Sequence, residues 1–223
     1  MHQKENSSIW VYLLRLLGGY LNVTAIILFS RVVGGQTGNI SKIAIAYVEG
    51  NFNTVFQLVA IAFTFILGGF ISGLFKPLDR EEMGSRYGFL FVGIGLIFIL
   101  FSIMGFYSVF FLLYLVLVLG VTNGITLYCK GMVVKTTIIT GTLTDIGITL
   151  SEMFKGASLD KQKLTFHCLN LFCFLLGATL AAFIGIRTTW NMVSIAGLLE
   201  LVIGFYFVSL REVAFGTEKE GTL

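Results

Sequence analysis

The chain has 223 residues, of which 56% are hydrophobic and only 12% are charged, and its net charge is +3. Soluble domains carry about a quarter charged residues, so this composition excludes a soluble globular fold and indicates a protein that needs lipid as part of its surroundings. The positive charge then bears on membrane topology, and no nucleic-acid partner is expected.

Long apolar runs predict an all-α integral membrane protein. A helix needs about 20 apolar residues to cross the hydrocarbon core of a bilayer. Six runs are long enough, and they are Ile9–Val33, Phe52–Phe75, Tyr87–Tyr107, Ser108–Tyr128, Leu164–Ile186 and Trp190–Leu210. The first is interpreted as a retained helix, because it is too long for a signal peptide and no small-residue cleavage site follows it.

Two shorter segments, Thr37–Val48 and Thr136–Phe154, follow the first and the fourth runs. They are moderately apolar, rich in Thr and Gly, and too interrupted to span. Gly frees or ends a helix, and irregular backbone at membrane depth persists only where protein or a wet cavity surrounds it. We expect short helices here, either re-entering the membrane or lying at its surface.

Lys and Arg placement predicts the topology. With the N-terminus in the cytoplasm, eleven of the 15 Lys and Arg residues fall on the cytoplasmic side, including those of the loop Lys76–Arg86. Three fall outside, namely Arg31, Lys42 and Arg187, and Arg15 lies within the first span. The positive-inside rule therefore predicts a multi-pass protein of the inner (cytoplasmic) cell membrane with both termini in the cytoplasm.

The two halves of the sequence resemble each other. Three stretches recur in the same order, beginning at Gly19 and Gly120, at Thr37 and Thr140, and at Phe65 and Phe174. Each half holds three spans, and an odd number reverses direction on repetition. We therefore predict two inverted repeats, residues 1–106 and 107–223, within one compact membrane domain, an arrangement found in secondary transporters.

The same stretches carry a family resemblance. TGNIS (from Thr37) and TTIITGTLTDIG (from Thr136), with the Asn22 and Asn123 elements before them, resemble the YoaK-like family of uncharacterised bacterial inner-membrane proteins. The resemblance covers nearly the whole chain and implies a compact six-span membrane protein, often guessed to be a transporter. The family pattern usually has Asp at the position of Asn22, so it implies that this chain lacks a carboxylate that could couple transport to protons.

The Thr-Gly segments are the predicted substrate site. A half-helix that begins within the membrane points unpaired N–H groups and its positive dipole end at whatever lies ahead. The predicted substrate-binding residues are Asn22, Thr37, Gly38, Asn39, Ser41, Asn123, Thr140, Gly141, Thr142, Thr144 and Asp145. The alternative is structural: Thr and Asn would only satisfy backbone groups of an interfacial helix, and the two Asn residues of the spans would only clamp helices together.

Intramembrane charges are functional candidates by default. Arg15 in the first span and Glu200 in the sixth fall in the inner half of the membrane, so an ion pair between them is expected, as a gate or as a strut. Arg15 could instead extend to the cytoplasmic interface. Small residues around Gly68 and Gly177 have spacing typical of close helix packing.

Metal and cofactor chemistry find little support. Three cysteines lack CxxC spacing, the two histidines are far apart, and His167 is interpreted as an interfacial residue. No phosphate-binding loop, dinucleotide fingerprint or nucleophile elbow occurs. We therefore expect no metal, no cofactor and no enzymatic activity.

The favoured hypothesis is a secondary transporter or facilitator of a small solute. The expected partners are the lipid bilayer, a small-molecule or ion substrate and, since six spans are few, a second copy in a homodimer. Two alternatives stay open: a channel, and an accessory membrane subunit with no transport of its own. A lipid-modifying enzyme would need a cluster of His, Asp or Glu at one interface, which the sequence lacks.

Overall fold

The structure is a computed structural model that describes residues 2–75, 86–105, 107–125, 127–129, 132–134, 138–155 and 160–220. Side chains are described from residue 9 to residue 209, apart from the strand segments. The predicted cytoplasmic loop Lys76–Arg86 lies outside the described residues except for Arg86, as does Thr136, the first residue of the second Thr-rich stretch.

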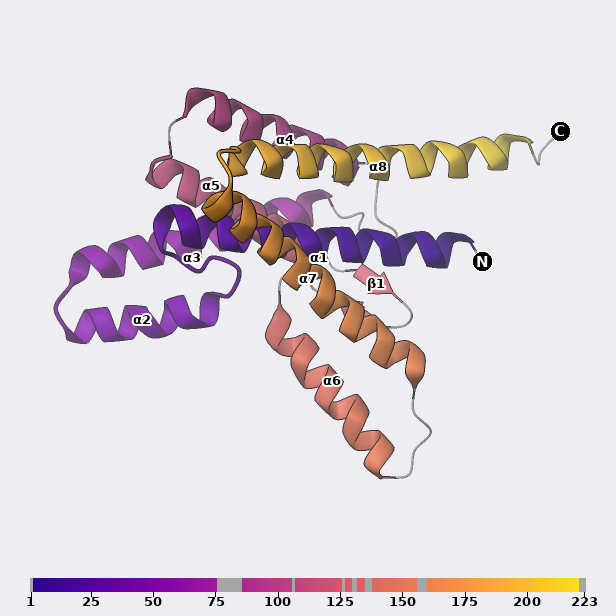
Figure 1. The fold of residues 1–223 in the computed structure, drawn as a ribbon, viewed down its shortest axis with the longest axis horizontal. Helices are drawn as coiled ribbons and strands as arrows, with labels where there is room; N and C mark the ends of the chain where they lie inside the picture. Colours follow the sequence, from indigo (N-terminus) through magenta and orange to yellow (C-terminus); the bar gives the residue numbers. More distant parts are fainter. Residues whose placement is uncertain are drawn as a thin grey trace.

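Helices make up almost all of the described chain, with one short antiparallel hairpin of strands (Figure 1). In chain order the elements are α1 (His2–Phe29), α2 (Gln36–Val48), α3 (Phe52–Phe75), α4 (Arg86–Met104), α5 (Val109–Gly124), β1 (Leu127–Cys129), β2 (Met132–Val134), α6 (Ile139–Phe154), α7 (Lys161–Arg187) and α8 (Met192–Glu220). The fold is therefore all-α in its main architecture, as the sequence predicts.

Five helices are long and apolar enough to cross a membrane: Ile9–Phe29 of α1, then α3, α4, α7 and Met192–Ser209 of α8. The sixth predicted span is shorter. Helix α5 has 16 residues and rises about 24 Å, below the roughly 30 Å of a bilayer core. A multi-pass membrane protein is therefore supported, with five full-length spans rather than six among the described residues.

Helix α1 ends at Phe29, four residues before the predicted boundary at Val33. Ser30 takes a positive φ of 53°, which turns the chain out of the helix. The chain then folds back along α1, where the backbone N–H groups of Val33 and Gly34 donate to Asn22 Oδ1 at 3.2 and 2.8 Å. Hydropathy alone could not place this boundary, because Val32 and Val33, which follow the turn, continue the apolar run.

Helix α5 likewise ends earlier than the predicted span Ser108–Tyr128. Ser108 caps its start by accepting a hydrogen bond from Phe110 N, and the helix stops at Gly124. The chain continues into strand β1, which pairs with β2 in a register that sets Tyr128 opposite Val133. The apolar run predicts a helix here and no strand.

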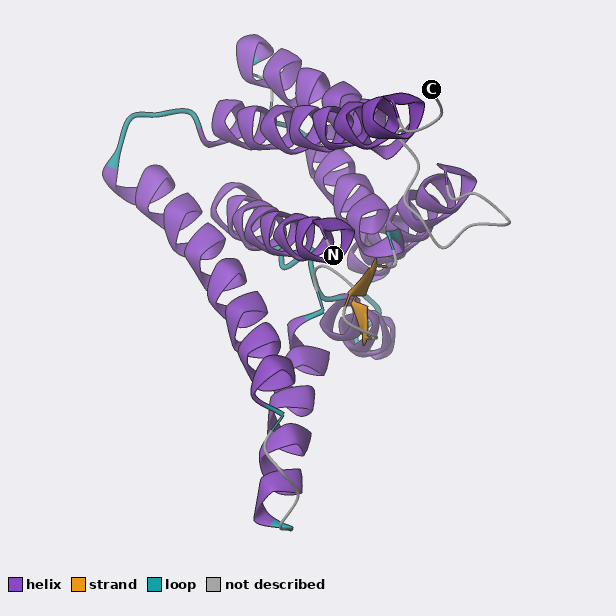
Figure 2. Ribbon diagram, turned by 90° about the vertical axis from the view of Figure 1, so that its right-hand side faces the viewer, coloured by secondary structure: helices purple, strands orange, loops and turns teal. Residues whose placement is uncertain are grey.

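The long helices pack in pairs around α1. Helix α1 packs along α7, α3 along α5 and α4 along α8, while α2 folds back on α3 and α6 on α7. Figure 2 shows α1 near the middle of the helices. Its side chains Trp10, Leu14, Leu17 and Leu21 are fully or almost fully buried, so α1 forms the centre of the apolar core.

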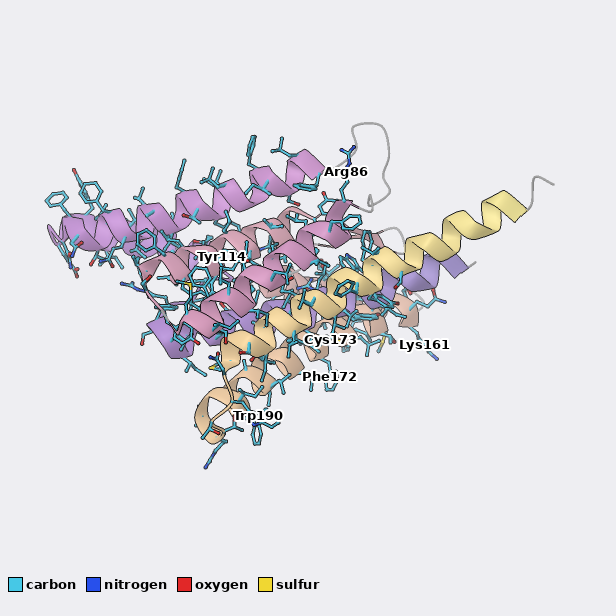
Figure 3. All side chains as sticks on the ribbon, turned by 90° about the horizontal axis from the view of Figure 1, so that it is seen from above. Arg86, Tyr114, Lys161, Phe172, Cys173 and Trp190 are labelled. Atoms are coloured by element: carbon cyan, nitrogen blue, oxygen red, sulfur yellow. The ribbon has the colours of Figure 1, made fainter. Side chains whose placement is uncertain are left out.

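The outer surfaces of the helices are apolar. Large exposed side chains line α3, α4 and α7, and Figure 3 shows Phe172 of α7 on the outside of the helices. Trp190, which is 69% exposed, lies in the short connection between α7 and α8, where an interfacial aromatic anchor is expected. A soluble protein rarely exposes so extensive an apolar surface, and lipid contact accounts for it.

Candidate functional site

Arg15 and Asn22 lie on one face of α1. They are seven residues apart, which is almost two full helical turns, so their side chains leave the helix in nearly the same direction. At 1.5 Å per residue they are separated by about 10 Å along the helix axis. Each of the two short helices, α2 and α6, begins beside one of these residues.

Helix α2 begins beside Asn22. Asn22 binds the segment that precedes α2 through the backbone N–H of Gly34. Glycine suits this position because a Cβ atom on residue 34 would lie only 3.1 Å from Asn22 Oδ1. Gln36 donates to Val33 O at 2.9 Å, and Asn39, which is buried, donates to Gln36 Oε1 at 3.1 Å. These bonds fix the first turn of α2 well inside the length of α1, from which α2 then runs away (Figure 1).

Helix α6 begins beside Arg15. The guanidinium donates from Nη1 to Ile138 O at 3.2 Å and from Nη2 to Thr142 Oγ1 at 3.1 Å. Arg15 is only 3% exposed. Ile138 is the N-cap residue of α6 and provides no side-chain cap, so the first N–H groups of the helix depend on other partners.

Two close contacts between acidic and basic side chains join helices α6 and α7. Asp145 Oδ2 lies 3.9 Å from His167 Nδ1, and Glu152 Oε2 lies 4.0 Å from Lys163 Nζ. Both pairs connect the two antiparallel helices of one hairpin. They are the ion pairs that the described residues contain.

Arg15 and Glu200 do not form the predicted ion pair. Arg15 has no carboxylate within 4 Å among the described side chains, and its guanidinium binds α6 instead. Glu200 is 0% exposed, and neither of its carboxyl oxygens has a hydrogen-bond partner within the described part of the chain. The structure thus separates two charges that sequence position alone places at similar depth.

The remaining predicted site residues fall into an exposed and a buried set. Exposed near the starts of α2 and α6 are Thr37, Gly38, Ser41, Thr140, Gly141, Thr144 and Asp145. Ser41 Oγ donates to Thr37 O and Thr144 Oγ1 donates to Thr140 O, each at 3.0 Å. Thr142 is buried against Arg15, and Asn123 is buried near the end of α5. The first turns of both short helices are therefore open on one side and anchored on the other.

Two residues of α7, neither of them among the predicted site residues, also lie in this region. His167 is buried because α6 covers it, and its Nε2 has no hydrogen-bond partner among the described residues. Asn170, three residues further along the same helix face, donates to Phe166 O while its Oδ1 is equally without a partner. The polar pair at i and i+3 within an apolar run is the signal that could have identified them.

Comparison with known proteins gives a family but no function. No curated protein and no solved structure matches this chain. The sequence model of one family, described as "Protein of unknown function (DUF1275)", matches residues 10–206, which extend from α1 into α8 and include the short helices α2 and α6. The chain therefore belongs to the DUF1275 family of proteins of unknown function.

Proposed function

We propose that this protein is a secondary transporter or facilitator of a small solute, with its binding site where α2 and α6 begin beside α1. The observation that carries the proposal is the fixed start of both short helices on one face of α1, at Asn22 and Arg15, about 10 Å apart. Transporters place discontinuous helices in this way, with the unpaired N–H groups of the half-helices directed at the solute.

The crossing of α1 with α7 and that of α3 with α5 support the inverted repeat. A Cβ atom on Gly19 would lie 2.1 Å from Phe174 O, and one on Gly120 would lie 2.4 Å from Phe65 O. Gly19 and Gly120 are the equivalent first residues of the first recurring stretch, and Phe65 and Phe174 are those of the third. The two contacts are thus the same contact with the halves exchanged.

The crossing of α4 with α8 obeys the same exchange. A Cβ atom on Gly95 would lie 2.9 Å from Gly197 O, and one on Gly204 would lie 2.9 Å from Gly88 O. Gly88 and Gly197 are separated by the same number of residues as Phe65 and Phe174, and so are Gly95 and Gly204. Exchanging the two halves therefore turns each contact into the other. A pseudo-twofold axis that passes between α4 and α8 accounts for this reciprocity.

The inverted repeat gives the site two opposite approaches. Under the predicted topology, α2 runs from the site toward the outside and α6 runs from it toward the cytoplasm. The exposed first turns around Thr37 and Thr140 then face the two sides of the membrane in equivalent ways. This is the symmetry that alternating access uses, in which one half rocks against the other around a fixed site.

The test is thermal unfolding of the purified protein in detergent against a panel of small metabolites and ions. A solute present at about 100 times its dissociation constant stabilises the folded state by roughly 2.7 kcal/mol. We expect at least one compound to stabilise the wild type and to lose its effect on the variant Thr37→Val/Thr140→Val. Thr64→Val is the matched control, because Thr64 lies in α3 and donates only to Ala60 O within its own helix.

A compound that stabilises the wild type and the double variant equally would contradict the proposed site. If solute flux into liposomes then rises without saturation, the channel becomes the better account. If no flux occurs and the protein purifies with a partner at fixed stoichiometry, the accessory-subunit account replaces transport.

A further inference from the structure

We propose that the solute is a small oxyanion, such as a carboxylate, and that it binds where the guanidinium of Arg15 meets the first turn of α6, on the donors that their mutual hydrogen bonds leave free. This inference rests on the proposed transport function and assigns the chemical class of the substrate. It is argued from the charge of Arg15, from the open end of α6 and from the buried His167 Nε2 of α7, which has no partner among the described residues.

The charge of Arg15 has no counter-charge in the described part of the protein. The side chain is 97% buried, and its two hydrogen bonds go to a neutral carbonyl, Ile138 O, and a neutral hydroxyl, Thr142 Oγ1. A guanidinium stays protonated in proteins, so its charge cannot be removed by losing a proton. A buried cation is strongly unfavourable unless it is paired, which makes an anionic partner the simplest way to complete the site.

The end of α6 adds a second positive contribution at the same place. Helix α6 has 16 residues, and its N-cap residue Ile138 makes no side-chain cap. The unpaired N–H groups of the first turn and the helix dipole favour a negative group there. The described structure places the Arg15 guanidinium beside this turn, so the donors of Arg15 and those of the first turn of α6 lie close together and both favour an anion.

The donors that remain fit an oxyanion better than a spherical ion. Arginine has five N–H donors in a planar fork, and the two bonds to α6 leave three, of which Nε–H is buried without a partner. The fork matches two oxygens of a carboxylate or a phosphate at once. Gly141, in the same turn of α6, has no neighbouring atom closer than 3.6 Å to the position of a Cβ, so space beside the backbone is available.

The α7 face that covers this end of α6 provides one further nitrogen that can donate. His167 Nε2 is buried without a partner in the described structure, whereas Asn170 Oδ1, also unpartnered there, is an acceptor and does not bind an oxyanion. The close contact of His167 Nδ1 with Asp145 Oδ2 joins α7 to α6 one helical turn beyond Gly141. We therefore assign Asp145 to the hairpin that closes the site and not to direct contact with the oxyanion, which it would repel.

The experiment measures thermal unfolding of the purified full chain in a neutral detergent at constant ionic strength. Sodium acetate, lactate, phosphate and sulfate are compared with chloride and with the neutral analogues acetamide and glycerol. We expect saturable stabilisation by at least one oxyanion, weakened about tenfold or more in Arg15→Gln and weakened less in Arg15→Lys, which keeps the charge but loses the planar fork. Arg31→Gln is the control, because Arg31 donates to Gln57 at the exposed end of α1.

A second pair of variants protects the test against loss of folding in Arg15→Gln. Thr142→Val removes the hydroxyl that accepts from Arg15, whereas Thr149→Val, also buried on α6, removes only a bond to Asp145 O within the helix. Weaker oxyanion binding in Thr142→Val than in Thr149→Val supports the assignment. Equal binding in both variants and in every folded Arg15 variant overturns it.

The outcomes separate this inference from the proposed function. If neutral solutes stabilise the wild type in a saturable way and no oxyanion does, the oxyanion assignment fails and transport stands. If an oxyanion binds through Arg15 but never exchanges across proteoliposomes that contain the protein, the site stands and transport fails.

Discussion

Individual polar residues of this protein take roles that their position in the sequence does not reveal. Arg15 and Asn22 both interrupt an apolar run, yet one binds the start of α6 and the other binds the segment before α2. The bonds connect residues 127 and 12 positions apart, respectively. Such pairings are set by the packing of helices, so a single span can be predicted from hydropathy while the partner of a polar group within it cannot.

Asn22 provides a direct test of the fold-back before α2. In Asn22→Leu the N–H groups of Val33 and Gly34 lose their acceptor, and each unsatisfied buried N–H costs about 1–3 kcal/mol. We expect a clearly lower unfolding midpoint in detergent. Asn22→Asp keeps an acceptor oxygen at the same place, so its midpoint should remain close to that of the wild type. An unchanged midpoint in Asn22→Leu would show that these bonds do not hold the segment.

Variants of Glu200 test whether its buried carboxyl group stabilises the fold through a bonded partner. Neither carboxyl oxygen is hydrogen-bonded among the described residues, so Glu200→Gln loses no such contact and keeps the volume. We expect its unfolding midpoint to differ from that of the wild type by only a few degrees, whereas Glu200→Ala leaves a cavity that costs about 2–4 kcal/mol. Strong destabilisation by the glutamine would point to an ionic partner for Glu200.

At the scale of elements, glycine sets how closely the helices approach. A Cβ atom on Gly68 would lie 2.2 Å from Leu117 O, and one on Gly177 would lie 1.9 Å from Leu16 O, so alanine at either position must push two backbones apart. We expect Gly68→Ala and Gly177→Ala each to destabilise the protein by about 1–3 kcal/mol.

Gly69→Ala is the matched control for these two variants. Gly69 is adjacent to Gly68 in α3, yet no atom lies within 4 Å of the position that its Cβ would occupy. Alanine favours helix over glycine by roughly 1 kcal/mol, so this variant should be as stable as the wild type or more so. Thermal unfolding in detergent compares all three, and equal loss of stability at Gly68 and Gly69 would contradict the described crossing.

Sequence patterns predict the elements better than they predict their ends and contacts. Apolar runs identify the long helices, and the Thr-Gly segments identify both α2 and α6 as short helices. The apolar run predicts a later end for α1, because Val32 and Val33, in the segment that folds back beside Asn22, continue the run. Small-residue spacing predicts close packing at Gly68, Gly69 and Gly73 alike, but a Cβ atom on Gly69 or on Gly73 would meet no atom within 4 Å. Spacing alone does not reveal which side of a helix faces its neighbour.

At the scale of the whole molecule, the proposed inverted repeat makes a prediction about sidedness. Glu49 and Lys155 are the exposed C-cap residues of α2 and α6, which the proposed repeat treats as equivalent elements. In a cysteine-free background, we expect Glu49→Cys to react with a membrane-impermeant maleimide added outside intact cells. Lys155→Cys should react only after the membrane is opened. Labelling of both from the same side would contradict inverted repeats and the predicted topology.

The measurement that tests the central claim most directly is solute exchange across proteoliposomes, using a compound that stabilises the purified protein. The claim that α2 and α6 form one transport site beside α1 predicts saturable exchange in the wild type and in Thr64→Val. It predicts exchange lost, with folding retained, in Thr37→Val/Thr140→Val. Exchange at the wild-type rate in the folded double variant would contradict a site built from the first turns of these two helices.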